Sequence, residues 1–166
     1  MTKSKITVIN TGGTFNKRYN PIAGELEVPK DSLALDEIIS YCYNIDFEVL
    51  NIISKDSLQM NDTDRELIVK TMKDCKNENI IIVHGTDTMD LTALYLDEKI
   101  KNKNIVLTGA MIPIAINKIE ATLNFSTSIG FLNSNIKNGI YIAMHGSVKN
   151  YTKLLKNREL GKFLEK

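Results

Sequence analysis

The alternation of short apolar runs with helix-like stretches is the feature that most constrains the fold of this chain. Five runs of β type occur in order: KITVIN (5–10), FEVLNII (47–53), NIIIVH (79–84), NIVLTG (104–109) and GIYIAMH (139–145). Several are apolar without alternation, which is typical of central strands covered on both faces. Helical patterns lie between them, over 32–43, 63–76, 89–100 and 118–132. Repeated strand–helix units predict an α/β fold, with a mostly parallel sheet and helices on both faces.

Two of the helical stretches carry more specific expectations. The segment 63–76 opens with Thr63 and Glu66 at capping-box spacing, which predicts that a helix begins there. The 2 cysteines, Cys42 and Cys75, lie on apolar helical stripes and form no metal or redox motif. We therefore expect reduced, buried thiols, which are typical of a cytoplasmic protein.

Length and composition limit the class of protein. A chain of 166 residues with 43% hydrophobic and 25% charged residues is typical of one globular domain. Its formal net charge of +1 argues against nucleic acid or an anionic membrane as a partner. The apolar runs are far shorter than a membrane span, and the N-terminus has no signal-peptide pattern, so we expect a cytoplasmic location. We assign the domain to residues 1–152 and expect the basic segment 153–166 to be a frayed tail or a truncated linker.

Residues suited to chemistry follow the predicted strands. In open parallel sheets, ligands bind beyond the carboxyl ends of the strands. The segments at those ends are 11–14, 54–62, 84–89, 109–113 and 145–147, and Lys156 follows the last of them. Their hydroxyls, carboxylate and amine suit nucleophilic attack on an acyl carbon, with glycine amides holding the oxyanion. This interpretation requires the first and third runs to be neighbours in the sheet.

The glycine pair and the threonine–aspartate pair also have simpler interpretations. Gly12 and Gly13 could form only a tight turn. They could also cradle a phosphate, although TGGTF lacks the lysine of a P-loop and the spacing of GxGxxG. Thr86 and Asp87 stand just before a helical pattern, where capping of the helix N-terminus is a rival role.

The remaining candidates have simpler roles as well. Ser57 could be a turn residue, Tyr19 an exposed loop aromatic, and Lys156 part of a solvated, lysine-rich face. His84 and His145 fit no spacing of metal ligands, so packing at strand ends is their expected role.

Two segments together resemble a known family. TGGTF at 11–15 and HGTDTMD at 84–90 are similar to the two signature segments of the bacterial-type L-asparaginase family. Further similarity extends from about residue 5 to about residue 157, and Lys156 stands where the family keeps its catalytic lysine. The resemblance implies a Rossmann/flavodoxin-like three-layer sandwich, as in the N-terminal domain of that family.

The resemblance also implies roles for single residues. Thr14 would be the primary nucleophile, and Tyr19, on a mobile lid, would help to activate it. Thr86, Asp87 and Lys156 would form a second hydroxyl–carboxylate–amine triad, in which Asp87 binds the substrate ammonium. The implied substrate-binding residues are Gly13, Asp56, Ser57, Gly85, Thr86, Asp87 and Ala110, with Ser57 on the α-carboxylate.

The implied reaction converts L-asparagine, or in some members L-glutamine, to the acid and ammonia. No metal and no organic cofactor are implied, and the implied partners are the small-molecule substrate and further copies of the chain in a dimer or tetramer. Family members also carry a smaller C-terminal domain that completes the active site of a neighbouring subunit. We therefore carry two hypotheses: an amidohydrolase, alone or with a second polypeptide, and a related module that binds aspartate or asparagine without turnover.

Three positions depart from the family pattern. Ile112 stands where many relatives have arginine, Glu120 replaces an aspartate, and Leu58 replaces a polar residue beside the substrate serine. The changes at Glu120 and Leu58 affect groups that support the site, and looser support often lowers activity.

Overall fold

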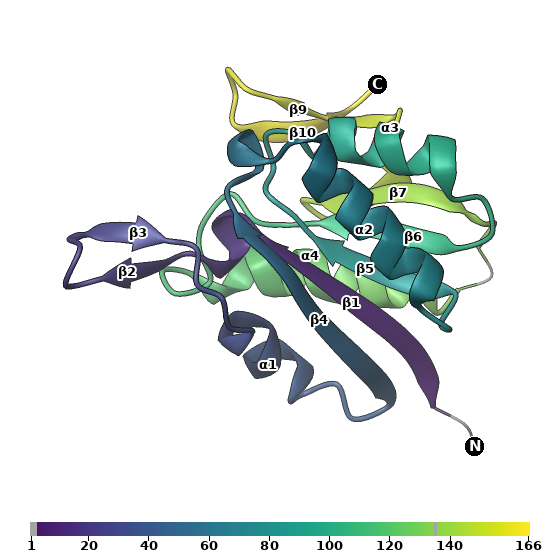
Figure 1. The fold of residues 1–166 in the computed structure, drawn as a ribbon, viewed down its shortest axis with the longest axis horizontal. Coiled ribbons are helices and arrows are strands. Elements are labelled where there is room, and N and C mark those ends of the chain that lie inside the picture. Colours follow the sequence, from purple (N-terminus) through teal and green to yellow (C-terminus); the bar gives the residue numbers. More distant parts are fainter. Residues whose placement is uncertain (1–2, 135) are drawn as a thin grey trace.

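A six-stranded sheet forms the centre of the molecule. The computed structural model describes residues 3–134 and 136–166 (Figure 1). The strands of the sheet are β1 (Ser4–Gly12), β4 (Ile45–Lys55), β5 (Asn79–Val83), β6 (Asn104–Thr108), β7 (Gly139–Met144) and β8 (Ser147–Asn150). They lie in the order β4-β1-β5-β6-β7-β8, and all neighbours are parallel except β7 and β8. The predicted α/β fold with a mostly parallel sheet is confirmed.

The strand order places the predicted first and third runs side by side. β1 pairs with β5 through Thr7–Ile80 to Asn10–Val83, and on its other side it pairs with β4. The five predicted runs therefore lie in the spatial order 2-1-3-4-5, and the direction of the winding reverses between β1 and β5. Ligands of such sheets bind at this switch point, at the carboxyl ends of the strands.

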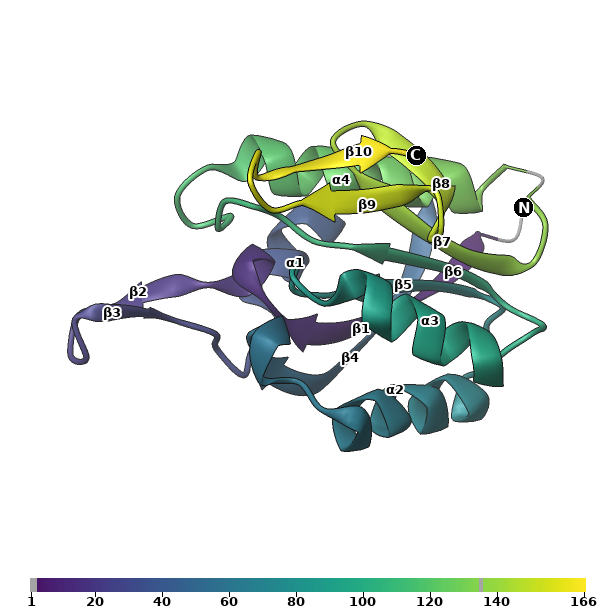
Figure 2. The same ribbon diagram turned by 90° about the horizontal axis from the view of Figure 1, so that it is seen from above.

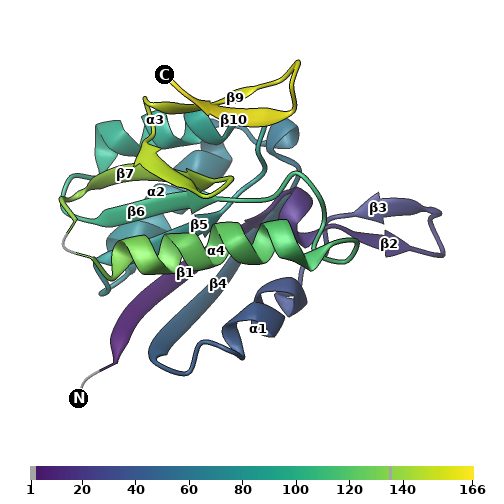
Figure 3. The same cartoon turned by 180° about the vertical axis from the view of Figure 1, so that it is seen from behind.

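Helices cover both faces of the sheet. They are α1 (Leu33–Ile39), α2 (Asp62–Asp74), α3 (Met89–Lys99) and α4 (Lys118–Leu132). Helices α2 and α3 cover one face, and α1 and α4 cover the other (Figures 2 and 3). Two separate apolar clusters follow from this arrangement, because each strand sends alternate side chains to opposite faces. Ile9 and Ile82 belong to the α2–α3 cluster, whereas Val8 and Ile81 belong to the α1–α4 cluster.

Helix boundaries differ from the predicted ones where tertiary contacts decide them. The first helix ends at Ile39, so Cys42 lies beyond it and is only partly buried. Helix α2 begins slightly earlier than predicted, with a capping box made by Asn61 and Asp64 instead of Thr63 and Glu66. Asp64 also binds Lys55 at the end of β4, at 2.8 Å. This ion pair gives Asp64 a second partner outside the helix, whereas the predicted box of Thr63 and Glu66 is not formed.

The segment 153–166, expected to be a frayed tail, is instead a packed hairpin. Strands β9 (Leu154–Asn157) and β10 (Lys162–Glu165) pair antiparallel and lie beside the carboxyl ends of the sheet strands (Figures 1 and 3). Leu154 and Phe163 are 1% and 6% exposed and join the α2–α3 cluster. The segment has too few apolar residues for its sequence pattern to predict these strands. The burial of Leu154 and Phe163 packs the hairpin against the core.

A second hairpin projects from the body of the molecule. It consists of β2 (Arg18–Asn20) and β3 (Glu25–Glu27), and it extends beyond the sheet in all three views (Figures 1–3). Its base is held by the bidentate ion pair of Arg18 and Asp31. Within the described residues 3–134 and 136–166, every helix falls short of the length and hydropathy that crossing a membrane requires.

The packing of the C-terminal hairpin gives a stability prediction. Leu154→Ala removes a side chain that is 1% exposed and leaves a cavity, so we expect the free energy of unfolding to fall by about 2–3 kcal/mol. Leu164→Ala, on the same hairpin but 43% exposed, is the matched control and should cost less than about 1 kcal/mol. Urea unfolding of both variants measures the difference, and equal losses would show that the hairpin does not pack on the core.

Candidate active site

The glycine pair at the end of β1 brings two loops into direct contact. Gly12 and Gly13 have φ angles of 101° and 72°, which side chains with a Cβ rarely adopt. A Cβ on Gly13 would lie 2.4 Å from the main-chain nitrogen of Gly85. The glycines therefore serve a close approach of main chain to main chain at the β1–β5 switch point. Thr14 and Thr86, the next residue of each loop, are brought to the same edge of the sheet.

A third loop packs against this pair from the end of β4. A Cβ on Gly85 would lie 2.6 Å from the Cβ of Ser57, which begins the 3-10 turn Ser57–Gln59. The hydroxyl of Ser57 accepts a hydrogen bond from the Asp87 amide at 3.2 Å, and its carbonyl accepts one from the Thr88 hydroxyl at 2.9 Å. Ser57 is 1% exposed, so in this structure it supports the loop that carries Thr86 and Asp87.

The C-terminal hairpin supplies an amine to the same loop. Lys156 Nζ lies 2.8 Å from Thr86 Oγ1 and 2.8 Å from Asp87 Oδ1. The Lys156 side chain is 13% exposed and the Asp87 side chain 31%, so water screens this ion pair only partly. An amine, a hydroxyl and a carboxylate from segments about seventy residues apart thus form one hydrogen-bonded group of Lys156, Thr86 and Asp87, called the Lys156 group below.

Two cations of this site were not among the predicted residues. Arg158 Nη2 donates to the main-chain oxygen of Asp87 at 2.8 Å, and Lys17 Nζ binds Asp56 Oδ2 at 2.7 Å. Burial disfavours the charged form of Asp56, but the Lys17 hydrogen bond and that from the Leu58 amide outweigh it and hold the pKa of Asp56 below its usual value. Arg158 is two residues from Lys156, and this strand-like spacing is the only sequence signal that could have indicated it.

The other predicted residues lie in three different environments. Thr14 begins the 3-10 turn Thr14–Asn16 and is partly exposed beside the Gly13–Gly85 contact. Tyr19 is 62% exposed on β2, and the hairpin of β2 and β3 projects away from the hairpin of β9 and β10 that carries Lys156 (Figure 1). Ala110 follows β6, and its side chain is fully buried in the α1–α4 cluster, so only its main chain can face a ligand.

The structure does not bear out helix capping by Thr86 or Asp87. The N-cap position of α3 is Thr88, and within the described part of the chain no side chain caps this helix end. The side chains of Thr86 and Asp87 bind Lys156 instead. Among the residues that the structure describes, no group of three or more histidine, cysteine, aspartate or glutamate side chains is arranged to hold a metal ion.

His84 anchors the Gly85–Asp87 loop from below. Its Nδ1 lies 2.7 Å from the Gly85 oxygen, which can only accept, so Nδ1 carries the proton. Its Nε2 accepts from Thr92 at 2.8 Å, and Thr92 in turn accepts from Arg65 Nε at 3.3 Å. Complete burial lowers the pKa of His84 from 6.5 to about 4, which keeps the ring neutral and this tautomer in place. The expected strand-end packing thus includes a buried hydrogen-bonded chain.

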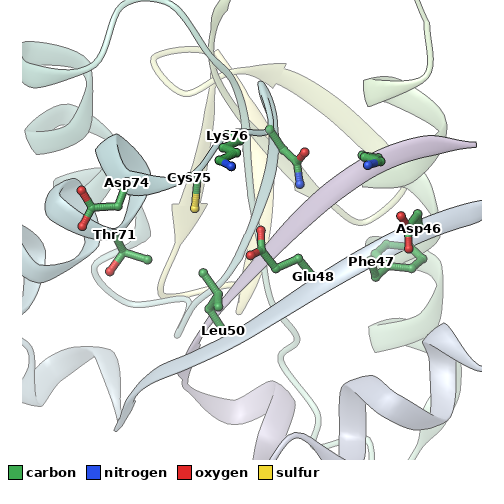
Figure 4. Close-up of a pocket in the computed structure, with 10 residues that line it drawn as sticks. Asp46, Phe47, Glu48, Leu50, Thr71, Asp74, Cys75 and Lys76 are labelled. Atoms are coloured by element: carbon green, nitrogen blue, oxygen red, sulfur yellow. The ribbon is translucent and has the colours of Figure 1, made fainter.

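Two hollows of the surface lie at opposite ends of the sheet. A cavity of about 250 Å³ is lined by Thr86, Asp87, Asp90, Lys156, Arg158 and Phe163, and it adjoins the hydrogen-bonded group. A larger, open groove of about 600 Å³ lies near the amino ends of β1 and β4, with Glu48, Leu50 and Cys75 on its walls (Figure 4). The smaller cavity is the candidate site, because the loops at the carboxyl ends carry the chemistry.

The burial of His84 predicts a pH dependence of stability. The unfolded chain binds a proton to this imidazole below pH 6.5, whereas the folded chain does so only near pH 4, so stability falls as pH drops through that interval. We expect His84 to contribute a loss of about 2 kcal/mol between about pH 7.5 and pH 5. His84→Gln should remove this contribution, as measured by urea unfolding at both pH values. An equally steep loss in wild type and variant would contradict the assignment.

Comparison with known proteins agrees with this geometry. The family model described as "Asparaginase, N-terminal" matches residues 5–160. An L-asparaginase of Thermococcus kodakarensis is 29% identical over 161 residues, which cover 95% of this chain and 49% of that protein. The L-asparaginase 2 of Escherichia coli is 31% identical over 133 residues, which cover 75% of this chain and 37% of that protein.

A solved structure agrees as well. The thermostable L-asparaginase from Thermococcus kodakarensis superposes with a TM-score of 0.84 at 27% identity, over 97% of this chain and 51% of that chain. This chain therefore spans about half the length of the L-asparaginase that it matches. The resemblance seen in TGGTF and HGTDTMD is confirmed, and the chain belongs to the asparaginase family, of which it represents the N-terminal domain.

Proposed function

We propose that this chain is an asparaginase-like amidohydrolase domain that hydrolyses the side-chain amide of L-asparagine to L-aspartate and ammonia. L-Glutamine is the second candidate substrate. The observation that carries the proposal is the placement of Lys156 Nζ at 2.8 Å from both Thr86 Oγ1 and Asp87 Oδ1. An amine hydrogen-bonded to a hydroxyl and a carboxylate is what proton transfer around a hydroxyl nucleophile needs. The proposed reaction uses no metal and no organic cofactor.

The proposed chemistry runs through an ester of Thr14. The Thr14 oxygen attacks the amide carbon, the C–N bond breaks, and the hydroxyl proton reaches the departing nitrogen, which leaves as ammonia. Water then attacks the ester, which releases aspartate and restores the Thr14 hydroxyl. Thr86, Asp87 and Lys156 move the protons in both steps, and the contact of Gly13 with Gly85 supports their closeness to Thr14.

The same loops offer partners for an amino acid. Among the described residues, Lys156 and Arg158 approach Oδ1 of Asp87, so Oδ2 is the oxygen proposed to bind the substrate ammonium. Ser57 Oγ already accepts the Asp87 amide, and its own hydrogen is the donor proposed for the α-carboxylate. The adjoining cavity of about 250 Å³ is lined by Asp87 and Lys156 but not by Ser57, and it is the space proposed for the amino acid. Asp56, Gly85 and Ala110 complete the proposed substrate contacts.

We also propose that copies of the chain associate. Four apolar side chains on the loop before α4 and on the outer face of α4 are 42–68% exposed: Ile112, Ile116, Ile119 and Leu123. Exposed apolar side chains on one loop and on the helix that follows it favour association, here proposed to give the expected dimer or tetramer. The free thiols Cys42 and Cys75 suit the proposed cytoplasmic location, where thiols stay reduced.

A second candidate function is binding of aspartate or asparagine without turnover. The exposure of Tyr19 on the projecting hairpin favours it, because the residue expected to activate Thr14 lies away from the Lys156 group. Calorimetric binding of either amino acid with no ammonia release would establish this alternative over the amidohydrolase.

Ammonia release from L-asparagine tests the amidohydrolase. Thr14→Ala and Lys156→Met should each lower the rate by about 100-fold or more, because the first removes the nucleophile and the second removes the proton carrier. Lys153→Met is the matched control, since Lys153 is exposed in the same lysine-rich segment, and it should keep wild-type activity. Wild-type protein that releases no ammonia, alone or with a co-expressed C-terminal partner, would refute the proposal.

Light scattering tests the association. Leu123→Glu places a charge among the four exposed apolar side chains at α4 and the loop before it. It should shift the protein toward monomer at about 10 µM, a concentration at which ordinary interfaces are occupied. Leu91→Glu is the matched control, because Leu91 is similarly exposed, at 51%, but lies on α3 and should leave the mass unchanged. A wild-type mass of one chain would contradict the proposed oligomer.

A further inference from the structure

His145 occupies an unusual place between the sheet and the C-terminal hairpin. It follows β7 with φ of 54°, a left-handed conformation that few residues other than glycine adopt, and Gly146 follows it at 80°. The His145 amide donates to Asn124 Oδ1 at 2.9 Å, and Asn124 Nδ2 donates to the Gly109 oxygen at 2.9 Å. The turn after β7 is thereby tied to α4 and to the loop after β6, and its backbone directs the imidazole toward the hairpin.

The ring itself links the main chain of the hairpin to the carboxylate of Glu120 on α4. Nδ1 lies 3.3 Å from the Phe163 nitrogen, which can only donate, so Nδ1 is unprotonated in the neutral ring. Nε2 then carries the proton and faces Glu120 Oε1 at 3.3 Å. The Phe163 ring stands edge-to-face on the imidazole, with centroids 6.0 Å apart and planes at 83°. Two polar contacts and one aromatic contact define the orientation of this side chain.

Each end of this link reaches the candidate site. Phe163 is the residue that pairs with Lys156 across the β9–β10 hairpin, so the anchored main chain lies directly opposite the lysine. On the other side, the Glu120 carboxylate accepts the amides of Met111 and Ile112 at 2.9 and 3.0 Å. These amides follow Ala110 in the loop after β6. The imidazole therefore joins the strand that positions Lys156 to the loop proposed to contact the substrate.

We propose that His145 is a positioning residue that holds Lys156 in hydrogen-bond distance of Thr86 and Asp87. It acts through the Phe163 main chain and, with Glu120, ties the hairpin to the loop of residues 110–112. The inference rests on the proposed function for its effect on turnover, and its structural part stands on contacts alone. It also accounts for the longer carboxylate side chain of Glu120, which reaches two loop amides and the imidazole together.

Two substitutions at His145 change the side chain while tolerating the left-handed backbone, so they test the role of the ring alone. His145→Gly removes the imidazole without straining the left-handed backbone. His145→Asn also tolerates this conformation, and its Oδ1 provides an acceptor close to the place of Nδ1, so it should recover part of the effect. Lys149→Ala is the matched control, because Lys149 binds Glu165 of the same hairpin at 3.3 Å, but at the residue paired with Leu154.

The primary measurement is independent of activity. In His145→Gly, amide hydrogen exchange at Phe163 should become about tenfold faster, the factor that one hydrogen bond contributes. The ¹³Cε resonance of Lys156 should shift toward that of a solvated lysine. His145→Asn should lie between wild type and His145→Gly in both measurements, and Lys149→Ala should leave both unchanged at residues 156 and 163. Unchanged Phe163 exchange and an unchanged Lys156 resonance in His145→Gly would overturn the inference.

Kinetics then separate positioning from a general loss of structure. If the wild type releases ammonia, His145→Gly should lower kcat about tenfold or more while KM changes less than about twofold, since the lysine moves protons and does not bind substrate in the proposed scheme. An equal loss in Lys149→Ala would overturn the positioning role. A wild type without turnover would refute the proposed function alone, because the exchange and resonance measurements still decide the placement of Lys156.

Discussion

The close approach of Gly13 to Gly85 is the constraint on which the rest of the site depends. A Cβ at Gly13 would lie 2.4 Å from the Gly85 nitrogen, so no other residue fits without moving one of the two loops. The strand order places β1 beside β5 at the switch point, and the glycines let the loops after these strands touch. Thr14 and Thr86 reach one edge of the sheet through this contact. The glycines therefore serve proximity, and the phosphate cradle is not needed to explain them.

The two histidines secure the site from opposite sides. His84 is fully buried, donates from Nδ1 to the Gly85 oxygen and thereby holds the loop that carries Thr86. His145 has the opposite tautomer, accepts the Phe163 amide on Nδ1 and faces Glu120 with Nε2. In each case a main-chain group decides which nitrogen carries the proton. Both rings act on the Lys156 group through the main chain that carries its members.

The ion pair of Lys156 and Asp87 contributes more to geometry than to stability. Removing two charges from water costs free energy that their attraction repays only when further hydrogen bonds are present. Here the Thr86 hydroxyl accepts one such bond from the amine, and Arg158 and Ser57 form hydrogen bonds with the main chain of Asp87. The group is thus held by neutral and charged contacts from several loops. This arrangement suits proton transfer, which needs the donor and acceptor at a defined distance.

The strand–helix order, the parallel sheet and the family follow from the sequence alone. Apolar periodicity is a local property, and TGGTF and HGTDTMD are contiguous. The sequence also indicated Lys156, because this residue follows the last predicted strand. The folded structure was needed to show that 154–165 is a hairpin, that Asn61 caps α2, that Lys17 and Arg158 lie at the candidate site, and that Tyr19 lies on a projecting hairpin. Most of these features depend on pairs of residues far apart in the chain, such as Lys17 with Asp56 or Arg158 with Asp87, and no local pattern encodes such a pair.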